Sequence, residues 1–199
     1  MYVVCTDLEG IFVPEIWINV AERTGIEELR ATTRDIPDYD VLMRQRLSLL
    51  DAHHIKLKNI TDVIATMDPL PGAREFLDWL RERLQVIVVS DTFSEFAHPL
   101  MRKLGWPTLF CHSLSTNGSG AITSYKLRQK DSKRQAVLAL KKLSYKVISV
   151  GDSYNDITML KEADKAILFR PPQNVVDEYP QFPMATEYDQ LKSIIEEII

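Results

Sequence analysis

The 199-residue sequence predicts a doubly wound α/β fold, in which helices cover both faces of a mainly parallel β-sheet. Two observations predict this class. Short apolar runs rich in β-branched residues recur along the chain, and stretches with helical periodicity separate them. Continuous apolar runs indicate strands buried on both faces, and the alternation of strands with helices is typical of a parallel sheet.

Four apolar runs are the predicted strands of this sheet: residues 3–5, 86–89, 147–150 and 166–169. Four segments with apolar residues at helical spacing are the predicted helices: residues 73–83, 94–104, 133–143 and 155–163. Strands and helices therefore alternate over most of the chain, as they do in a Rossmann-like core.

Two segments interrupt this alternation. Residues 15–70 are almost wholly helical in pattern and contain no convincing strand, so we interpret them as a helical cap inserted after the first strand. The predicted domains are accordingly an α/β core of residues 1–14 and 71–199 and a cap of residues 15–70. Within residues 108–128, two β-like runs flank the turn-rich sequence Asn117-Gly118-Ser119-Gly120, which indicates a small β-hairpin.

The bulk composition argues against several classes of protein. Apolar residues make up 45% of the chain, which is enough for a sizeable buried core. The formal net charge is only −4 with both signs mixed along the chain, which argues against a nucleic-acid-binding protein. No apolar run approaches the roughly 18 residues that a membrane-spanning helix needs.

The cysteines and the N-terminal residues indicate a cytoplasmic protein. Cys5 and Cys111 lie far apart and form no metal-ligand cluster, so we expect two reduced thiols. The chain enters its first strand at Tyr2 without the basic and apolar segments of a secretion signal. We therefore expect a cytoplasmic location and no membrane partner.

Acidic and polar side chains follow three of the predicted strands. In chain order they are Asp7 and Glu9, then Ser90 and Asp91, then Asp152, Asn155 and Asp156. Because ligands bind outside the carboxyl ends of the strands in such sheets, these side chains should share one site. Crowded carboxylates repel one another, and a bound hard cation relieves that repulsion. Mg²⁺, which prefers carboxylate, water and phosphate oxygens, is the predicted ion.

The same residues form an ordered set of motifs. Asp7-Leu8-Glu9-Gly10 comes first, Ser90 second, Lys133 at the start of a predicted helix third, and Gly151-Asp152-Ser153-Tyr154-Asn155-Asp156 last. This order, with a cap after the first motif, resembles the haloacid dehalogenase superfamily over nearly the whole chain. The resemblance implies an enzyme that transfers phosphoryl groups through an aspartyl phosphate formed on Asp7.

The resemblance also implies the roles of the other motif residues. The metal would be held by Asp7, Asp152 and a backbone carbonyl near Glu9, and it would offset the repulsion between carboxylate and phosphate. The residues expected to contact the substrate at its phosphate end are Ser90, Asp91, Lys133 and Asn155. Asp156 is expected to orient Lys133 and the waters of the metal.

Glu9 departs from the pattern of the superfamily, which usually places Asp two residues after the nucleophile. That residue protonates the leaving oxygen and later activates water. Glu performs the same chemistry from one methylene further out, so the reaction class stands while the geometry of water attack changes. An alcohol could then compete with water for the aspartyl phosphate, which is our hypothesis for transfer beside hydrolysis.

Two residues of the predicted cap indicate the substrate. Glu15 follows soon after the nucleophile, where the chain leaves the strand edge. Arg46 lies in a segment with helical periodicity. The residues three and four positions before and after it are all apolar: Leu42, Met43, Leu49 and Leu50. Together Glu15 and Arg46 could bind the ammonium and carboxylate of an amino acid. The alternatives are an ion pair of Arg46 within the cap and a solvated acid at the first turn of a helix for Glu15.

This pair resembles the phosphoserine phosphatase branch of the superfamily. Three further runs, residues 13–18, 32–40 and 127–131, are similar to members of that branch that also pass the phosphoryl group to homoserine. The resemblance implies phosphoserine as substrate and homoserine as an acceptor, and a homodimer is one expected assembly. Homoserine is serine with one more methylene, so the same two residues could hold it.

Other classes of function are consistent with parts of the pattern. A signalling receiver domain also uses a phosphorylated Asp, Mg²⁺, a hydroxyl and a lysine, but neither the large insertion nor the Gly-Asp-x-x-Asn-Asp set suits it. An inactive scaffold would lack one of the key groups, and none is missing. Within the enzymes, a phosphonatase or sugar-phosphate hydrolase remains an alternative if Glu15 and Arg46 face away from the site.

His112 has no partner at ligand spacing, so we expect it to pack in the core or lie on the surface.

Overall fold

The computed structural model describes residues 1–33, 35–36 and 38–199. Arg34 and Pro37, which belong to the run 32–40 compared above, lie outside the described residues. The described part of the chain contains a seven-stranded sheet in the order β4-β3-β2-β1-β5-β6-β7. Its strands are β1 (Tyr2–Thr6), β2 (Gln85–Phe93), β3 (Thr108–Thr116), β4 (Ile122–Lys126), β5 (Lys146–Gly151), β6 (Lys165–Phe169) and β7 (Met184–Ala185).

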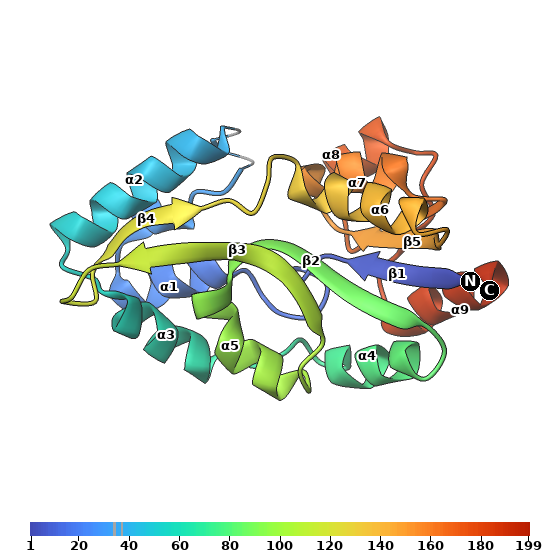
Figure 1. The fold of residues 1–199 in the computed structure, drawn as a ribbon, viewed down its shortest axis with the longest axis horizontal. Coiled ribbons are helices and arrows are strands. Elements are labelled where there is room, and N and C mark those ends of the chain that lie inside the picture. The colour runs from blue at the N-terminus through green and yellow to red at the C-terminus, as the bar shows by residue number, and fades with distance from the viewer. Residues whose placement is uncertain (34, 37) are drawn as a thin grey trace.

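The strands from β3 to β7 pair in parallel, and only β4 runs antiparallel to its neighbour. Along β1 the side chains alternate between two cores. Val4 packs in the larger core with helices α4 (Ala73–Arg81) and α9 (Tyr188–Ile198), while Val3 and Cys5 pack with α6 (Ser132–Lys142) and α7 (Ile157–Glu162). Helices therefore cover both faces of the sheet, and the predicted doubly wound α/β class is confirmed (Figure 1).

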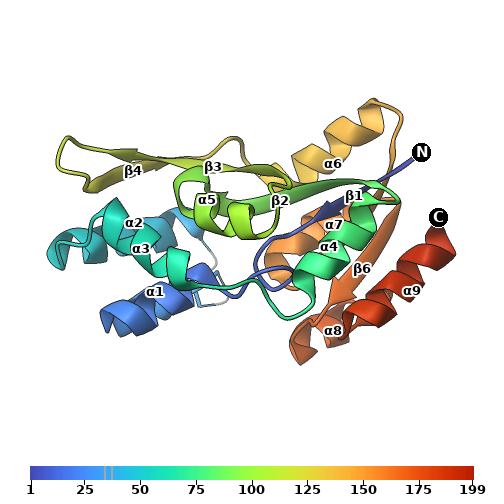
Figure 2. The ribbon, with the colours of Figure 1, turned by 90° about the horizontal axis from the view of Figure 1, so that it is seen from below.

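Among the described residues of the range 15–70, where the cap was predicted, there are three helices and one short 3₁₀ segment. They are α1 (Ile16–Thr24), η1 (Glu27–Arg30), α2 (Tyr39–Ala52) and α3 (Leu57–Thr66). Figure 2 shows α1, α2 and α3 beside the hairpin of β3 and β4, at the end of the molecule away from both chain termini. The division of the chain into a core and a cap at residues 14/15 and 70/71 stays a prediction.

The predicted hairpin is confirmed, since β3 and β4 lie within residues 108–128 and pair antiparallel. β3 first pairs in parallel with β2 at Thr108–Phe110 and then pairs antiparallel with β4 at Ser113–Thr116. The hairpin thus continues the sheet toward α2, where Tyr125 on β4 donates a hydrogen bond to Asp40. This contact connects the sheet to a helix of the range 15–70.

The remaining helices are α5 (Ser94–Lys103), the 3₁₀ segment η2 (Tyr154–Asp156) and α8 (Gln173–Glu178). Among the described residues, no helix combines the length and the apolar character that a membrane span requires. Cys5 and Cys111 are both free thiols, as the sequence predicted.

Candidate active site

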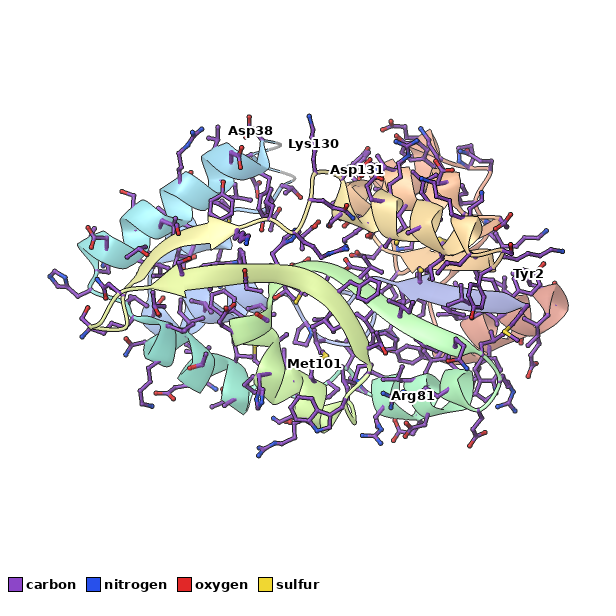
Figure 3. The ribbon with its side chains drawn as sticks, viewed as in Figure 1. Tyr2, Asp38, Arg81, Met101, Lys130 and Asp131 are labelled. Carbon is purple, nitrogen blue, oxygen red and sulfur yellow. The ribbon has the colours of Figure 1, made fainter. Side chains whose placement is uncertain are left out.

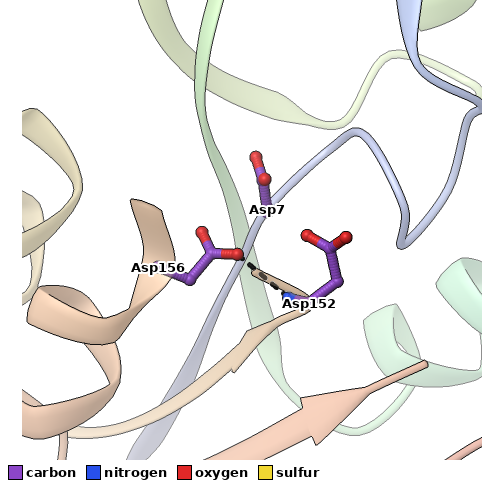
Figure 4. Close-up of side chains that lie close together, drawn as sticks. All are labelled: Asp7, Asp152 and Asp156. Atoms are coloured by element: carbon purple, nitrogen blue, oxygen red, sulfur yellow. Dashed lines mark hydrogen bonds between the residues drawn. The ribbon is translucent and has the colours of Figure 1, made fainter. Parts of the chain in front are cut away.

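Three neighbouring parallel strands carry the candidate site at their carboxyl ends. β1 lies between β2 and β5 in the sheet, so Asp7, Ser90 and Asp152 come out at the same edge. Asp7 and Asp152 directly follow β1 and β5, and Ser90 lies within β2, two residues beyond Val88, the last residue of β2 that pairs with β1. Figure 4 shows Asp7, Asp152 and Asp156 gathered there.

Asp7 is buried and held by two donors. Its Oδ1 accepts a hydrogen bond from the backbone N–H of Leu8 at 2.7 Å, and its Oδ2 lies 2.9 Å from Nζ of Lys133. Burial raises the pKa of Asp7 well above its usual value, Lys133 opposes that rise, and Asp156 and Asp152 add to it. The carboxylate is therefore desolvated and oriented, which suits a nucleophile whose charge must be offset by neighbours.

Lys133 is the buried cation at the centre of this cluster. Its Nζ lies 2.7 Å from Oδ1 of Asp156 and 3.8 Å from Oδ2 of Asp91, in addition to its contact with Asp7. Burial alone would lower the pKa of Lys133, but Asp156, Asp7 and Asp91 together raise it well above its usual value. Lys133 is thus a fixed positive charge at neutral pH.

Asp156 supports the loop that carries Asp152. Its Oδ2 accepts hydrogen bonds from the backbone N–H groups of Asp152 at 2.9 Å and Ser153 at 3.3 Å. Gly10 comes so close that a Cβ atom there would lie 2.6 Å from Oδ2 of Asp152, and its φ of +76° is in the left-handed region. Only glycine fits this position without displacing the carboxylate.

The carboxylates fit a hard divalent cation. Asp7, Asp152 and Asp156 each offer an oxygen, and these oxygens lie within 4.8 Å of one another in a buried cluster. Asp156 already accepts from Lys133 and from two backbone N–H groups, so Asp7 and Asp152 are the better candidates for ligands. An all-oxygen set with few protein ligands is what Mg²⁺ prefers.

Asp91 joins a second network beside Lys133. Its Oδ1 accepts from Oγ of Ser132 at 3.3 Å and lies 3.3 Å from Nε2 of His112, while its Oδ2 accepts from Nδ2 of Asn155 at 3.5 Å. Nδ1 of His112 accepts from the backbone N–H of Arg128 at 3.1 Å, so Nε2 carries the ring proton and donates to Asp91. Burial would raise the pKa of Asp91, but Lys133 and His112 lower it to about 2.

The other end of the site holds two acids and an arginine. Oε2 of Glu9 accepts from the backbone N–H of Ile16 at 2.8 Å, at the N-terminus of α1. Burial and the neighbouring carboxylate of Glu15 raise the pKa of Glu9 to about 8. Glu9 keeps some exposed surface because it faces the cavity described below.

Arg46 is 6% exposed and lies beneath the ring of Trp17, with its guanidinium carbon 4.4 Å from the ring centroid. Its Nη2 donates to the carbonyl of Ala31 at 2.8 Å, whereas its buried Nε has no hydrogen-bond partner among the described residues. Burial lowers the pKa of Arg46 to about 10, and the charges of Glu9 and Glu15 oppose that effect. The guanidinium is therefore a buried cation, and its Nε donor is available for a further hydrogen bond.

One cavity of about 90 Å³ brings nine of the ten predicted site residues together. They are Asp7, Glu9, Glu15, Arg46, Ser90, Asp91, Lys133, Asp152 and Asn155. The tenth, Asp156, is completely buried and lies against Lys133. Arg46 was predicted either to face the site or to form an ion pair within the cap, and it lines this cavity.

Sequence reasoning missed Tyr39, His112 and Ser132. His112 is buried, as expected for a packed residue, but it also hydrogen-bonds Asp91 from a distance of 21 residues in the chain. Tyr39 lines the cavity and donates to the backbone carbonyl of Asp91 at 3.1 Å. No spacing rule links these residues to the motifs, and the only sequence signal is the hairpin pattern that follows His112.

A Rossmann-like sheet, an inserted helical segment and an Asp–Lys–Asp cluster at the strand ends together define a phosphoryl-transferring hydrolase of the haloacid dehalogenase type. The chain belongs to this family. Residues 8–164 match the family of haloacid dehalogenase-like hydrolases. A receiver domain is not consistent with this membership.

Curated relatives agree with the branch predicted from the motifs. The chain is 63% identical over 190 residues to a phosphoserine phosphatase of Pseudomonas syringae pv. tomato, a match that covers 96% of this chain and 80% of that protein. It is 62% identical over 192 residues to phosphoserine phosphatase ThrH of Pseudomonas aeruginosa, covering 96% and 94%. The resemblance to the superfamily and to its phosphoserine phosphatase branch is therefore confirmed.

Solved structures share the fold. A solved structure of a phospho-aspartyl intermediate analogue of phosphoserine phosphatase superposes with a TM-score of 0.78 at 22% identity. The match covers 98% of this chain and 97% of that one. An apo phosphoserine phosphatase also superposes with a TM-score of 0.78, at 23% identity and the same coverage. At this identity the likeness shows the architecture alone.

Proposed function

We propose that this enzyme is a Mg²⁺-dependent phosphoserine phosphatase that also transfers the phosphoryl group to homoserine. The observation that carries the proposal is the cavity that Glu15 and buried Arg46 line together with the Asp7–Lys133 pair. A small amino acid needs one anion and one cation to be held at its two charged ends. The names of the relatives that are 62–63% identical support the same substrate.

The proposed reaction begins at Asp7. Its carboxylate oxygen attacks phosphorus, the bond from phosphorus to the serine oxygen breaks, and an aspartyl phosphate forms. Lys133 neutralises negative charge on the phosphoryl oxygens, and the buried hydroxyl of Ser90 donates a hydrogen bond to one of them. Water then attacks the aspartyl phosphate and releases inorganic phosphate.

Glu9 is the proposed acid and base. With a pKa of about 8, the Glu9 carboxyl is mainly protonated at neutral pH, and it can give this proton to the departing serine oxygen. The carboxylate left behind then takes a proton from the attacking water. The hydrogen bond from the backbone of Ile16 to Oε2 orients the group for both steps.

Asp7, Asp152 and the backbone near Glu9 would hold Mg²⁺. Bound there, the ion would offset the repulsion between the nucleophilic carboxylate and the phosphate. Asn155 and Asp156 fix the loop and Lys133 around it. The predicted contact of Asp91 with substrate stays a prediction; its carboxylate oxygens accept from His112, Ser132 and Asn155, an arrangement that supports a role in orienting Lys133 and Asn155.

Arg46→Met tests the carboxylate clamp. Loss of a charge-assisted hydrogen bond of 1.5–3 kcal/mol predicts that kcat/KM for phosphoserine falls roughly 10- to 100-fold. Phosphoethanolamine carries the same phosphate and ammonium without a carboxylate, so its kcat/KM should change less than about threefold. Steady-state phosphate release from both esters measures the two effects.

Arg44→Met is the matched control, because Arg44 is exposed on the same helix, and it should leave both esters unaffected. Equal losses for phosphoserine and phosphoethanolamine in Arg46→Met would show that Arg46 stabilises the cap rather than binding a carboxylate.

Glu9→Asp tests the origin of transfer. The shorter side chain restores the usual geometry of water attack, so the ratio of phosphohomoserine to phosphate should fall by roughly tenfold, in the range of one-methylene effects. Both products are followed together with phosphoserine as donor and homoserine in excess. A ratio that stays constant or rises in Glu9→Asp would rule out Glu9 as the residue that favours transfer.

The cytoplasmic location and the homodimer inferred from the sequence stay predictions. Neither bears on the chemistry proposed above, because the described residues of one chain supply every side chain that it uses.

A further inference from the structure

A second, larger cavity of about 720 Å³ lies next to the candidate active site. Asp38 at the N-terminus of α2 lines one side, and Lys130 and Asp131 before α6 line the other (Figure 3). Five residues line both cavities and so stand between them: Thr33, Tyr39, Asp91, Lys133 and Asn155. The inner cavity contains the reacting groups, and the outer one contains none of Asp7, Glu9 or Arg46.

Tyr39 is the largest side chain of this shared wall, and it is fixed from three directions. Its hydroxyl donates to the carbonyl of Asp91 at 3.1 Å. Its ring meets the rings of Tyr125 and His112 edge-on, with centroid separations of 6.0 and 6.4 Å. Burial, with the nearby charge of Asp91, raises the pKa of Tyr39, so the hydroxyl remains a neutral donor.

We propose that Tyr39 determines substrate size by closing the inner cavity against the outer one. This inference rests on the proposed function and extends it to the leaving group. The inner cavity, at about 90 Å³, has about one eighth of the volume of the outer one, so the space on the inner side of Tyr39 favours a short leaving group. A longer or aromatic leaving group would have to cross the position of the Tyr39 ring to reach the outer cavity.

The ring of Tyr39, rather than the hydrogen bond of its hydroxyl, separates the two cavities. Tyr39 is the first residue of α2, and Asp38 directly before it accepts a hydrogen bond from the backbone N–H of Val41 at 3.0 Å. This cap and the aromatic contacts hold the ring in place even without the hydroxyl. Removal of the ring should therefore join the two cavities, whereas removal of the hydroxyl alone should not.

The test compares two substrates in wild type, Tyr39→Ala and Tyr39→Phe. The quantity measured is kcat/KM for p-nitrophenyl phosphate divided by kcat/KM for phosphoserine. Tyr39→Ala should raise this ratio by about tenfold or more, because an aryl leaving group gains space while the acid–arginine pair is kept. Tyr39→Phe should leave the ratio within about threefold of wild type, because the ring that separates the cavities remains.

Tyr125→Ala controls for a loosened hairpin, since Tyr125 supports the ring of Tyr39 but lines neither cavity. The proposal is overturned if the ratio is unchanged in Tyr39→Ala, or if Tyr125→Ala raises it equally. Thermal unfolding of each variant shows whether it is folded, and an unfolded Tyr39→Ala would be replaced by Tyr39→Leu with the same expectation. Failure of the proposed function would appear separately, as a wild-type enzyme that does not turn over phosphoserine.

Discussion

Asp7→Asn should abolish phosphate release from phosphoserine, with a fall in kcat of roughly 10⁴-fold or more, as when a covalent nucleophile is lost. The amide keeps the shape of the side chain and its contact with the backbone of Leu8, but it cannot form the acyl phosphate bond of the intermediate. Transfer to homoserine should fall by the same factor, because both reactions share the aspartyl phosphate. Phosphate and phosphohomoserine measured in one reaction mixture test the two losses together.

Asp62→Asn is a suitable control for this change, because Asp62 pairs with Lys58 on the exposed surface of α3. Its activity should equal that of wild type, since an exposed ion pair of this kind contributes about 0.3–0.5 kcal/mol. An Asp7→Asn protein that is folded and retains more than about one hundredth of the activity would show that another group attacks phosphorus.

Lys133→Met should impair both catalysis and folding. Without the buried cation, the carboxylates of Asp7, Asp156 and Asp91 repel one another, and the phosphate loses a donor. We expect kcat to fall roughly 10²- to 10³-fold. Removal of one partner from a buried ion cluster should also lower the free energy of unfolding by about 3–5 kcal/mol at neutral pH.

The pH dependence of this loss follows from the pKa of Asp91, which is about 2 in the folded protein and is held down by Lys133 and His112. A lowered carboxyl pKa stabilises the fold above the unfolded value of about 3.9, and that stabilisation disappears as the pH falls toward 2. Lys133→Met should therefore differ from wild type most at pH 7 and least near pH 2–3. Urea unfolding without metal at both pH values measures the difference.

Lys142→Met on the exposed end of the same helix is the matched control and should change neither quantity. A stability difference that is the same at pH 7 and near pH 2–3 would mean that Lys133 acts by packing rather than by its charge.

Much of the fold was predictable because buried parallel strands have a simple sequence pattern, a continuous apolar run. The runs at residues 3–5 and 147–150 lie within β1 and β5, and they are apolar throughout because both faces of these strands are covered. β7, α8 and α9 were not predicted, and the first two are too short to show a period. The sequence indicates β3 only as part of a hairpin, because a strand that pairs in parallel and then antiparallel has no single pattern.

The candidate site was predictable to the extent that strand ends position it. Asp7, Ser90 and Asp152 come together because parallel strands deliver their carboxyl ends to one edge. Tyr39 and His112 could not be found in this way, because their contacts with Asp91 span 52 and 21 residues and depend on where the cap and the hairpin pack. Glu15 was predicted from its place soon after the nucleophile and Arg46 from its apolar neighbours, and the packing of α1 and α2 places both on one cavity.

The most direct test of the proposed function uses the metal-stripped protein with phosphoserine, with and without Mg²⁺ and with and without homoserine. Free phosphate and phosphohomoserine are followed in the same samples. We expect phosphate release only with Mg²⁺, and diversion of part of that phosphate into phosphohomoserine when homoserine is present. A folded, Mg²⁺-loaded protein that releases phosphate from other small esters but leaves phosphoserine intact would contradict the assignment of Glu15 and Arg46 as the amino-acid clamp.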